Sequence, residues 1–264
     1  MIVRQQSAIR SLRSVVRSFS ERRVNLGDGV VTAPLPARPD QFIEFYLQDP
    51  YRVSHDDGIA AAAPEAVIVG PQSYRRTRLF LSGSLHVFTI RFQPGGFHAL
   101  FGIPMTVLVN EGVPSGDVLG AAAADLYGAV MFARGFDERV AAVQIWLGRR
   151  LEMSCPVDLV GRLAAVLQRS GGRLPVRVLA ERAELSDRQF TRRFETQVGL
   201  TPKLFARTVR LNAVLDAKAS TPSMSWTTLV HGAGYADQAH FVRDCRALTG
   251  NAPANFFADW APGR

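Results

Sequence analysis

Two stretches near the end of the chain repeat one pattern of apolar and polar positions. They cover residues 176–194 and 226–243, and each holds a short apolar helix, a tight turn and a second helix. Phe190 and Phe194 at the end of the first stretch, and Val198 just after it, recur every four residues, which is the spacing of one buried helical face. Arginines occupy the opposite face of the same helix, and Ser186 and Asp237 are candidate caps for the second helix of each unit. The pattern predicts two helix-turn-helix units, one after the other.

A single helix is predicted between the two units. Residues 202–217 have helical periodicity, begin with a proline suited to a first turn, and would span roughly 24 Å at 1.5 Å per residue. Apolar positions such as Phe205 and Val209 would bury this helix as a rigid strut. Two reading helices fixed by one strut can enter two successive major grooves of the same duplex without a partner subunit. Sequence-specific binding of double-stranded DNA is therefore our leading hypothesis.

In the preceding part of the chain the apolar residues recur with a different period. Short β-prone runs are predicted at several places, with a hairpin around Gly83, and from about residue 121 the period becomes helical. Asp137 is a candidate cap for a helix over residues 137–151. We predict an α+β chain, in which a β-rich sensor domain precedes an all-α domain with two helix-turn-helix subdomains joined by a linker helix. The β-prone runs are residues 41–47, 66–69, 79–81 and 85–92.

The charge distribution divides the chain in a similar way. The formal net charge is +8, and residues 157–264 carry 15 basic against 9 acidic residues, whereas residues 24–156 are slightly acidic. Residues 1–23 hold six arginines and one glutamate, a composition typical of a basic arm or an organellar targeting segment, and we expect an arm. The predicted divisions are a basic N-terminal arm at 1–23, a β-rich regulatory and ligand-sensing domain with C-terminal helices at 24–153, and a DNA-binding domain at 157–258.

Taken together, these residues resemble the AraC/XylS transcription regulators. The resemblance covers residues 157–258 and implies groove-entering helices at 187–197 and 237–247. Residues 35–40, 49–53, 69–72 and 91–97 also resemble an N-terminal domain found in some of these regulators, and this second resemblance names no ligand. The first resemblance is carried by Leu179-Ala180, Leu185-Ser186, Phe190, Arg192-Arg193-Phe194, Gly199, Pro202, Arg210-Leu211, Ala213, Gly234-Tyr235, Gln238, Phe241, Arg243, Gly250 and Pro253.

The resemblance also implies which side chains meet DNA. Arginine is well suited to this role because its guanidinium group can donate two hydrogen bonds to O6 and N7 of guanine. Arg193 lies off the predicted reading face, where a phosphate contact or an ion pair is expected. By matching position, the candidate DNA-binding residues are Arg188, Thr191, Arg192 and Arg193 in the first unit, and Gln238, Ala239, His240 and Arg243 in the second.

Four positions depart from the family pattern. Glu184 stands in the first turn where the family favours glycine, and a non-glycine residue at positive φ costs about 1 kcal/mol or more. Val230 replaces a small alanine. Cys245 replaces a core phenylalanine, so a smaller side chain fills that part of the core. Ala239 offers only a methyl group to a base. The second unit is therefore expected to read fewer bases than the first, or mainly to contact phosphates.

Other chemistry finds less support in the residues. His55, His86 and His98 lack the spacing of a metal site, so no metal and no cofactor are expected, and neither catalysis nor membrane insertion is expected. Two cysteines without a disulfide framework fit a reducing compartment, the cytoplasm. The alternatives are an enzymatic N-terminal domain, or a ligand-binding module whose helical partner binds DNA without specificity. Besides DNA, the expected partners are an unknown small-molecule effector, RNA polymerase and a second copy of the chain.

Overall fold

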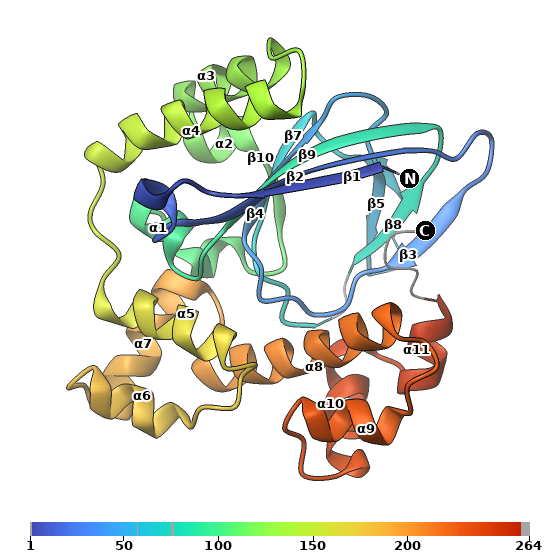
Figure 1. Ribbon diagram of the computed structural model, residues 1–264, viewed down its shortest axis with the longest axis vertical. Helices are drawn as coiled ribbons and strands as arrows, with labels where there is room; N and C mark the ends of the chain where they lie inside the picture. Colours follow the sequence, from blue (N-terminus) through green and yellow to red (C-terminus); the bar gives the residue numbers. More distant parts are fainter. Residues whose placement is uncertain (1, 57, 75–76, 260–264) are drawn as a thin grey trace.

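Two antiparallel sheets form the first half of the chain in the computed structural model, which describes residues 2–56, 58–74 and 77–259 (Figure 1). Within these residues one sheet has six strands in the order β1–β2–β9–β4–β7–β10, and the other has four in the order β3–β8–β5–β6. The six strands are β1 (Ile2–Ser7), β2 (Val16–Asn25), β9 (Ser84–Phe92), β4 (Phe42–Tyr46), β7 (Ala66–Val69) and β10 (Gly112–Pro114). The four are β3 (Val31–Pro34), β8 (Thr77–Leu81), β5 (Arg52–His55) and β6 (Ala61–Ala62).

Strand β9 separates two apolar cores. Successive side chains of a strand point to opposite faces of the sheet. Phe88 and Ile90 therefore join the core beneath the helices of the N-terminal part, whereas Leu85 and Val87 join a smaller cluster on the other face, between the sheets. All four side chains are buried. The strands predicted over residues 41–47, 66–69, 79–81 and 85–92 agree with β4, β7, β8 and β9.

The expectation that residues 1–23 form a basic arm is wrong. Strand β1 pairs antiparallel with β2, and β2 pairs with β9 along most of its length. Leu12, Val15 and Phe19 are fully buried in the main core, while Arg17 and Arg23 on β2 are exposed. The exposed arginines of β2 explain the misreading, because arginines on the solvent face of a strand resemble an arm in composition.

The hairpin expected around Gly83 is also absent from the described residues. Strands β8 and β9 flank this glycine but belong to different sheets, and each pairs with other partners. Gly83 has φ +68°, a left-handed conformation that glycine adopts without steric cost. The turn therefore passes the chain from one sheet to the other.

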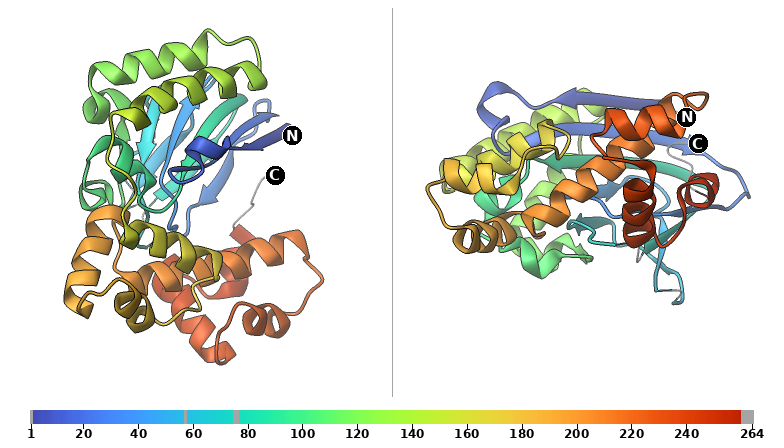
Figure 2. Two further views of the ribbon diagram at one scale, coloured as in Figure 1. Left: turned by 60° about the vertical axis from the view of Figure 1, so that its left-hand side comes forward. Right: turned by 90° about the horizontal axis from the view of Figure 1, so that it is seen from below.

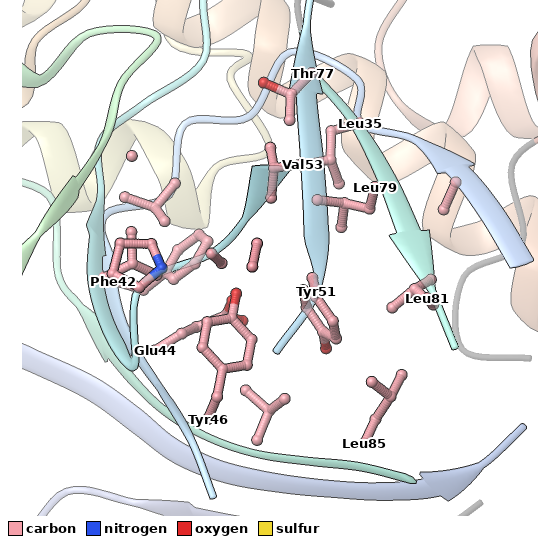
Figure 3. Close-up of a pocket in the computed structure, with 18 of the residues that line it drawn as sticks. Leu35, Phe42, Glu44, Tyr46, Tyr51, Val53, Thr77, Leu79, Leu81 and Leu85 are labelled. Atoms are coloured by element: carbon pink, nitrogen blue, oxygen red, sulfur yellow. The ribbon is translucent and has the colours of Figure 1, made fainter. Parts of the chain in front are cut away.

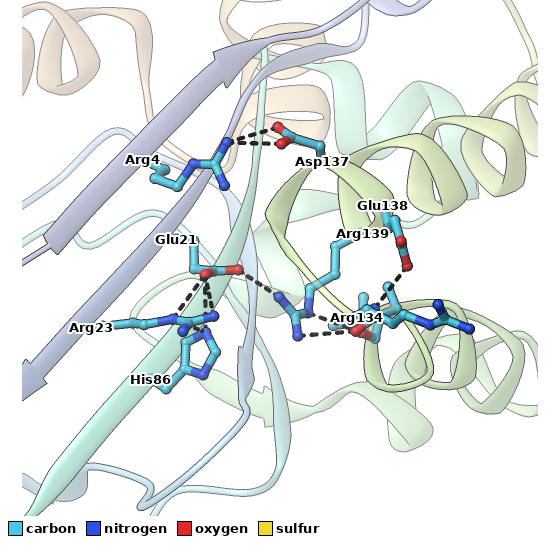
Figure 4. A network of polar contacts seen from close by, with 10 residues as sticks. Arg4, Glu21, Arg23, His86, Arg134, Asp137, Glu138 and Arg139 are labelled. Carbon is cyan, nitrogen blue, oxygen red and sulfur yellow. Dashed lines mark hydrogen bonds and ion pairs between the residues drawn. The ribbon is translucent and has the colours of Figure 1, made fainter.

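Helices α3 (Ala121–Met131) and α4 (Phe136–Glu152) pack on the six-stranded sheet, at the far end from the C-terminal helices (Figure 2). Asp137 lies in the first turn of α4, whose N-cap is Gly135, so the predicted cap is wrong. A buried ion pair fixes α4 to the sheet: Arg139 Nη1 lies 2.7 Å from Glu21 Oε2 (Figure 4). His86 Nε2 lies 3.1 Å from the other oxygen of Glu21, and burial lowers the pKa of His86 despite this contact.

Short helices complete the N-terminal part, and seven helices follow in the described C-terminal residues. Helix α8 lies between two groups of helices and runs along the lower ends of the sheets in Figure 1. None of the described helices is long and apolar enough to cross a membrane. The short helices are η1 (Arg10–Leu12), α1 (Gly96–Phe101), η2 (Met105–Leu108) and α2 (Ser115–Leu119). The C-terminal helices are α5 (Leu159–Arg169), α6 (Val176–Arg182), α7 (Asp187–Val198), α8 (Pro202–Ser220), α9 (Trp226–Gly232), α10 (Gln238–Thr249) and α11 (Pro253–Asp259).

Candidate nucleic-acid interface and ligand cavity

The two predicted helix-turn-helix units have the same backbone turn. Helices α6 and α7 form the first unit, and α9 and α10 form the second. Glu184 adopts φ 55° in the first turn and Gly234 adopts φ 82° in the second. The amide of the next residue, Leu185 or Tyr235, then donates back to a carbonyl of the first helix, at 3.1 and 3.2 Å. Glu184, which stands where the family favours glycine, therefore adopts the left-handed conformation and carries the associated strain.

Side-chain caps fix the start of both reading helices, α7 and α10. Ser186 Oγ accepts from the amide of Gln189 at 3.3 Å, and Gln189 Oε1 accepts from the amide of Ser186 at 3.1 Å, which makes a capping box. Asp237 Oδ1 accepts from the amide of His240 at 2.6 Å. Both predicted caps are therefore confirmed, and each helix begins at a defined residue with its first turn facing outward.

The strut α8 holds both units through its arginines. Arg210 Nη1 donates to the carbonyl of Gly172 beside the first unit at 2.6 Å, and its guanidinium group lies 5.6 Å from the ring centre of Tyr235 in the second unit. Arg207 Nε donates to Asp244 Oδ1 on α10 at 2.9 Å. One helix therefore fixes the positions of both units.

The candidate DNA-binding residues of the first unit lie on one open face of α7. Arg188 and Arg192 are exposed and make no ion pair with any described residue, and Thr191 between them is half-buried. Arg193 points away toward α5, where its Nη2 lies 3.9 Å from Asp158 Oδ2. Two guanidinium groups and one hydroxyl are thus available on the same face, while the third arginine is close to an acidic partner.

The candidate residues of the second unit are more engaged with the protein itself. His240 packs edge-on against the ring of Tyr235, with 5.1 Å between centroids, and its Nε2 lies 3.8 Å from Asp244 Oδ2. Gln238 Nε2 donates to Thr227 Oγ1. Ala239 and Arg243 are exposed. Arg243 is thus the one exposed arginine among the four candidate residues of α10.

The N-terminal part contacts both reading helices at their C-terminal ends. Gln41 Nε2 donates to the carbonyl of Val198, the last residue of α7, at 3.0 Å. The amide of Ala37 donates to the carbonyl of Leu248 on α10 at 3.1 Å. Because these contacts lie one to three turns from the candidate DNA-binding residues, they leave the outward faces of both helices open. The sequence analysis did not predict these contacts. The one feature that pointed to an unusual segment here is the proline-rich stretch over residues 34–39.

A cavity of about 400 Å³ lies between the two sheets (Figure 3). Glu44 and Tyr46 point into it from β4 and Tyr51 from the residue before β5, and most of the remaining wall is apolar. Sequence reasoning missed it, because the wall is assembled from short strands that are far apart in the chain. The apolar lining includes Val24, Leu26, Leu35, Val53, Val67, Leu79, Leu81, Leu85 and Val87.

The polar side of the cavity is internally paired. Arg22 Nη2 donates to Tyr51 Oη at 3.1 Å and lies 3.4 Å from Glu44 Oε1. Tyr46 Oη donates to Glu44 Oε2 at 3.4 Å, and the two tyrosine rings meet edge to face at 5.0 Å. Burial raises the pKa of Tyr51 to about 12, and burial also raises the pKa of Tyr46. Both phenols are therefore neutral near pH 7 and can take part in hydrogen bonds with a guest molecule.

The three histidines of the N-terminal part have separate partners. His55 Nδ1 lies 3.1 Å from Thr77 Oγ1, His86 pairs with Glu21, and His98 Nδ1 lies 2.8 Å from the carbonyl of Ile103. Among the described residues no group of three histidine, cysteine, aspartate or glutamate side chains could hold a metal ion.

Comparisons with known proteins match both halves of the chain. A helix-turn-helix domain model of AraC type matches residues 179–259, and the model of a domain of unknown function (DUF6597) matches residues 10–114. The second match begins inside the segment expected to be an arm, in agreement with its place in the sheet. No curated protein matches the chain.

Three solved structures illustrate the range of similarity. ToxT from Vibrio cholerae is 9% identical with a TM-score of 0.49, over 92% of this chain and 99% of that one. Wild-type ToxT from strain SCE256 with unsaturated fatty acid bound is 11% identical with a TM-score of 0.49, over 92% and 96%. The AraC-like transcriptional activator CuxR is 11% identical with a TM-score of 0.29, over 80% and 85%. At these scores the likeness says nothing about ligands.

Two helix-turn-helix units on a shared strut, preceded by a β-rich domain, define a DNA-binding transcription regulator. More particularly, its C-terminal part carries a helix-turn-helix domain of AraC type over residues 179–259, and its N-terminal β-rich part matches the domain of unknown function DUF6597 over residues 10–114.

Proposed function

We propose that the protein binds a specific operator by placing α7 and α10 in two successive major grooves of one duplex. The observation that carries this proposal is the placement of the two reading helices. Each has its first turn and outward face open, its C-terminal end held by the N-terminal part, and its unit fixed to α8. Reading helices of this class contact bases through their N-terminal residues. As a regulator of transcription it would act in the cytoplasm, with RNA polymerase as a further predicted partner.

The two units would divide the work of recognition. Arg188 and Arg192 are free to form paired hydrogen bonds with guanines, and Thr191 lies between them. In the second unit Arg243 is the strongest candidate, with His240 and Gln238 supporting it after they exchange their present partners for DNA. Arg193 would contact phosphate once its weak approach to Asp158 is lost. We therefore expect the first unit to supply most of the base discrimination.

The test is a selection of bound sequences from random double-stranded DNA by the full chain, repeated with Arg192→Ala. The selected site should contain two half-sites about one helical turn apart, and the variant should lose preference at one base pair of one half-site. Arg177→Ala is the matched control, because Arg177 is exposed on α6 and pairs with Glu181 on its own helix at 2.9 Å. Enrichment of no sequence, or an unchanged preference in Arg192→Ala, would refute the proposal.

We further infer that the cavity between the sheets binds a small-molecule effector with an apolar body. Its volume of about 400 Å³ and its largely aliphatic wall support this reading. Glu44 and Tyr51 are already paired with Arg22, which favours binding rather than catalysis as the role of this site. Calorimetric titration of the full chain with apolar metabolites tests the inference, and replacement of Val53 by tryptophan should narrow the cavity and weaken binding.

We also propose two domains, near residues 24–153 and 157–258, and we add residues 1–23 to the first because they form part of its sheet.

We propose in addition that the chain forms a homodimer through α3 and α4. Phe132, after α3, is 90% exposed, and Ile145 on α4 is 60% exposed beside it in a shallow groove. Large apolar side chains that share a groove favour a protein contact. Sedimentation of Phe132→Ser should give a lighter particle than the unmodified chain, and an unchanged mass would refute this interface.

A further inference from the structure

A short segment of the N-terminal part, residues 37–41, contacts both helix-turn-helix units. At one end Ala37 is fully buried in the apolar core of the second unit, and its amide donates to the carbonyl of Leu248 on α10 at 3.1 Å. At the other end Gln41 Nε2 donates to the carbonyl of Val198, the last residue of α7, at 3.0 Å. This connecting segment therefore joins the C-terminal ends of the two reading helices.

The connecting segment is short and stiff. Its two ends are four residues apart, and four residues of extended chain span at most about 14 Å. Pro39 lies between the ends and fixes one backbone angle. The backbone of Arg38 pairs in both directions with that of Gln72, at 2.9 and 2.8 Å, which anchors the middle of the segment to the N-terminal part. The contacts with the two reading helices therefore cannot move far apart.

The first unit is fixed to the N-terminal part by further packing. Gly199, which ends α7, has φ +90°, and a Cβ atom added there would lie 2.7 Å from Pro71 Cγ and 3.1 Å from the carbonyl oxygen of Met105. The backbone at the end of α7 thus lies directly against the N-terminal part. Val109 also packs against the core of the first unit. The first unit is therefore held on the N-terminal part, and the connecting segment extends this hold to the second unit.

The contact with the second unit also involves the strut α8. Asn212 Nδ2 on this helix donates to the carbonyl of Ala37 and to the carbonyl of Thr208 on its own helix, both at 2.8 Å. Helix α8 has 19 residues, and helices of this length commonly curve, so a strut alone leaves some freedom in the angle between the two units. A second connection, made by a different segment, removes much of that freedom.

We propose that the connecting segment fixes the distance and the angle between α7 and α10, and so determines the spacing of half-sites that the protein accepts. The proposal rests on the proposed binding of an operator by these two helices. Ala37 and Gln41 are positioning residues in it, because their contacts lie at the C-terminal ends of the reading helices. One base pair changes the separation of two half-sites by about 3.4 Å and their relative rotation by about 35°. Two units held in one arrangement cannot follow such a change.

The test with DNA uses duplexes that carry the two selected half-sites at the selected spacing, and with one base pair inserted or deleted between them. Fluorescence anisotropy at one salt concentration measures how tightly the full chain binds each duplex. The unmodified chain should bind the altered spacings about tenfold more weakly, or worse. Gln41→Ala releases the end of α7, and Ala37→Glu is too large for its fully buried site in the second unit. Both variants should reduce the penalty severalfold, whereas Ala37→Gly keeps the backbone bonds and should retain it.

Two controls match these substitutions. Gln93→Ala removes a bond of the same kind inside the N-terminal part, from Gln93 Nε2 to the carbonyl of Arg13 at 3.2 Å. Ala121→Glu adds the same charge at an exposed position on α3. Both controls should keep the spacing preference of the unmodified chain. If Gln41→Ala and Ala37→Glu weaken binding equally at every spacing, the segment only stabilises the fold and the proposal is overturned.

A second measurement needs no DNA. Spin labels are attached to the two units at exposed positions, through Arg182→Cys on α6 and Ala247→Cys on α10, with Cys155→Ser removing the exposed native thiol. The distribution of distances between the labels should be narrow and should broaden when Gln41→Ala or Ala37→Glu is added. An unchanged distribution would overturn the proposal even if an operator is found. Failure to select any operator would overturn the proposed function and the role in spacing together, whereas an unchanged spacing preference on a selected operator would overturn the role in spacing alone.

Discussion

The first and second helix-turn-helix units share a turn and a cap but differ in what surrounds them. Phe194 in the first unit packs between Phe190 and Phe205, and the reading face above them carries two unpaired arginines. In the second unit Cys245 takes the corresponding core place, and Ala37 enters the core from the N-terminal part. N-terminal residues contact both units, since Val109 packs against the core of the first. The two units therefore differ mainly in the open arginine face of the first and in the smaller core side chain of the second.

The largest effect expected from this comparison concerns the two cores. Phe194→Ala should destabilise the first unit by about 3–5 kcal/mol, because it empties a fully buried aromatic site. Cys245→Ala removes only a sulfur atom and should cost about 1 kcal/mol. Urea unfolding with hydrogen exchange resolved by residue measures both losses. Equal losses in the two variants would show that the cores are of the same quality and would break the comparison.

A second effect concerns the reading faces. Arg192→Ala should weaken binding to the selected operator by about 1–3 kcal/mol, whereas His240→Ala should cost well under 1 kcal/mol because His240 already packs on Tyr235. Fluorescence anisotropy at one fixed salt concentration measures both, since phosphate contacts make the affinity depend on salt. A larger loss from His240→Ala would reverse the proposed division between the units.

Local patterns in the sequence predicted the parts of this comparison that depend on neighbouring residues. The spacing of Phe190 and Phe194 predicted α7, and the caps Ser186 and Asp237 predicted where the reading helices begin. Glu184 stands where the family favours glycine, and this departure pointed to the strained turn. Each of these features is set by contacts within one or two turns of chain. The sequence therefore predicted the reading helices nearly to the residue.

Contacts between distant segments could not be predicted in this way. Strand β2 was not predicted because its arginines suggested an arm, and only its pairing with β1 and β9 shows that this segment is part of the sheet. The cavity depends on how two sheets face each other, and no local period encodes that. Ala37 gave no sign that its small side chain fits into a core more than 170 residues away, where it meets Asn212 and its neighbours. These features depend on how distant segments of the chain pack together, and a single sequence gives little indication of that packing.

The smallest expected effect concerns the turn that the two units share. Glu184→Gly should stabilise the first unit by about 0.5–1 kcal/mol, because glycine adopts φ 55° without the clash of a Cβ atom. The reciprocal change, Gly234→Ala, should destabilise the second unit by about 1 kcal/mol or more, since it adds strain at φ 82° and places a Cβ 2.8 Å from Arg173 Cδ. Thermal unfolding of the two variants and of the double variant measures the changes, which should be additive because the turns lie in separate cores. If Glu184→Gly were destabilising, Glu184 would hold the turn through its side chain, and the two units would differ in how their turns are stabilised as well as in their cores and faces.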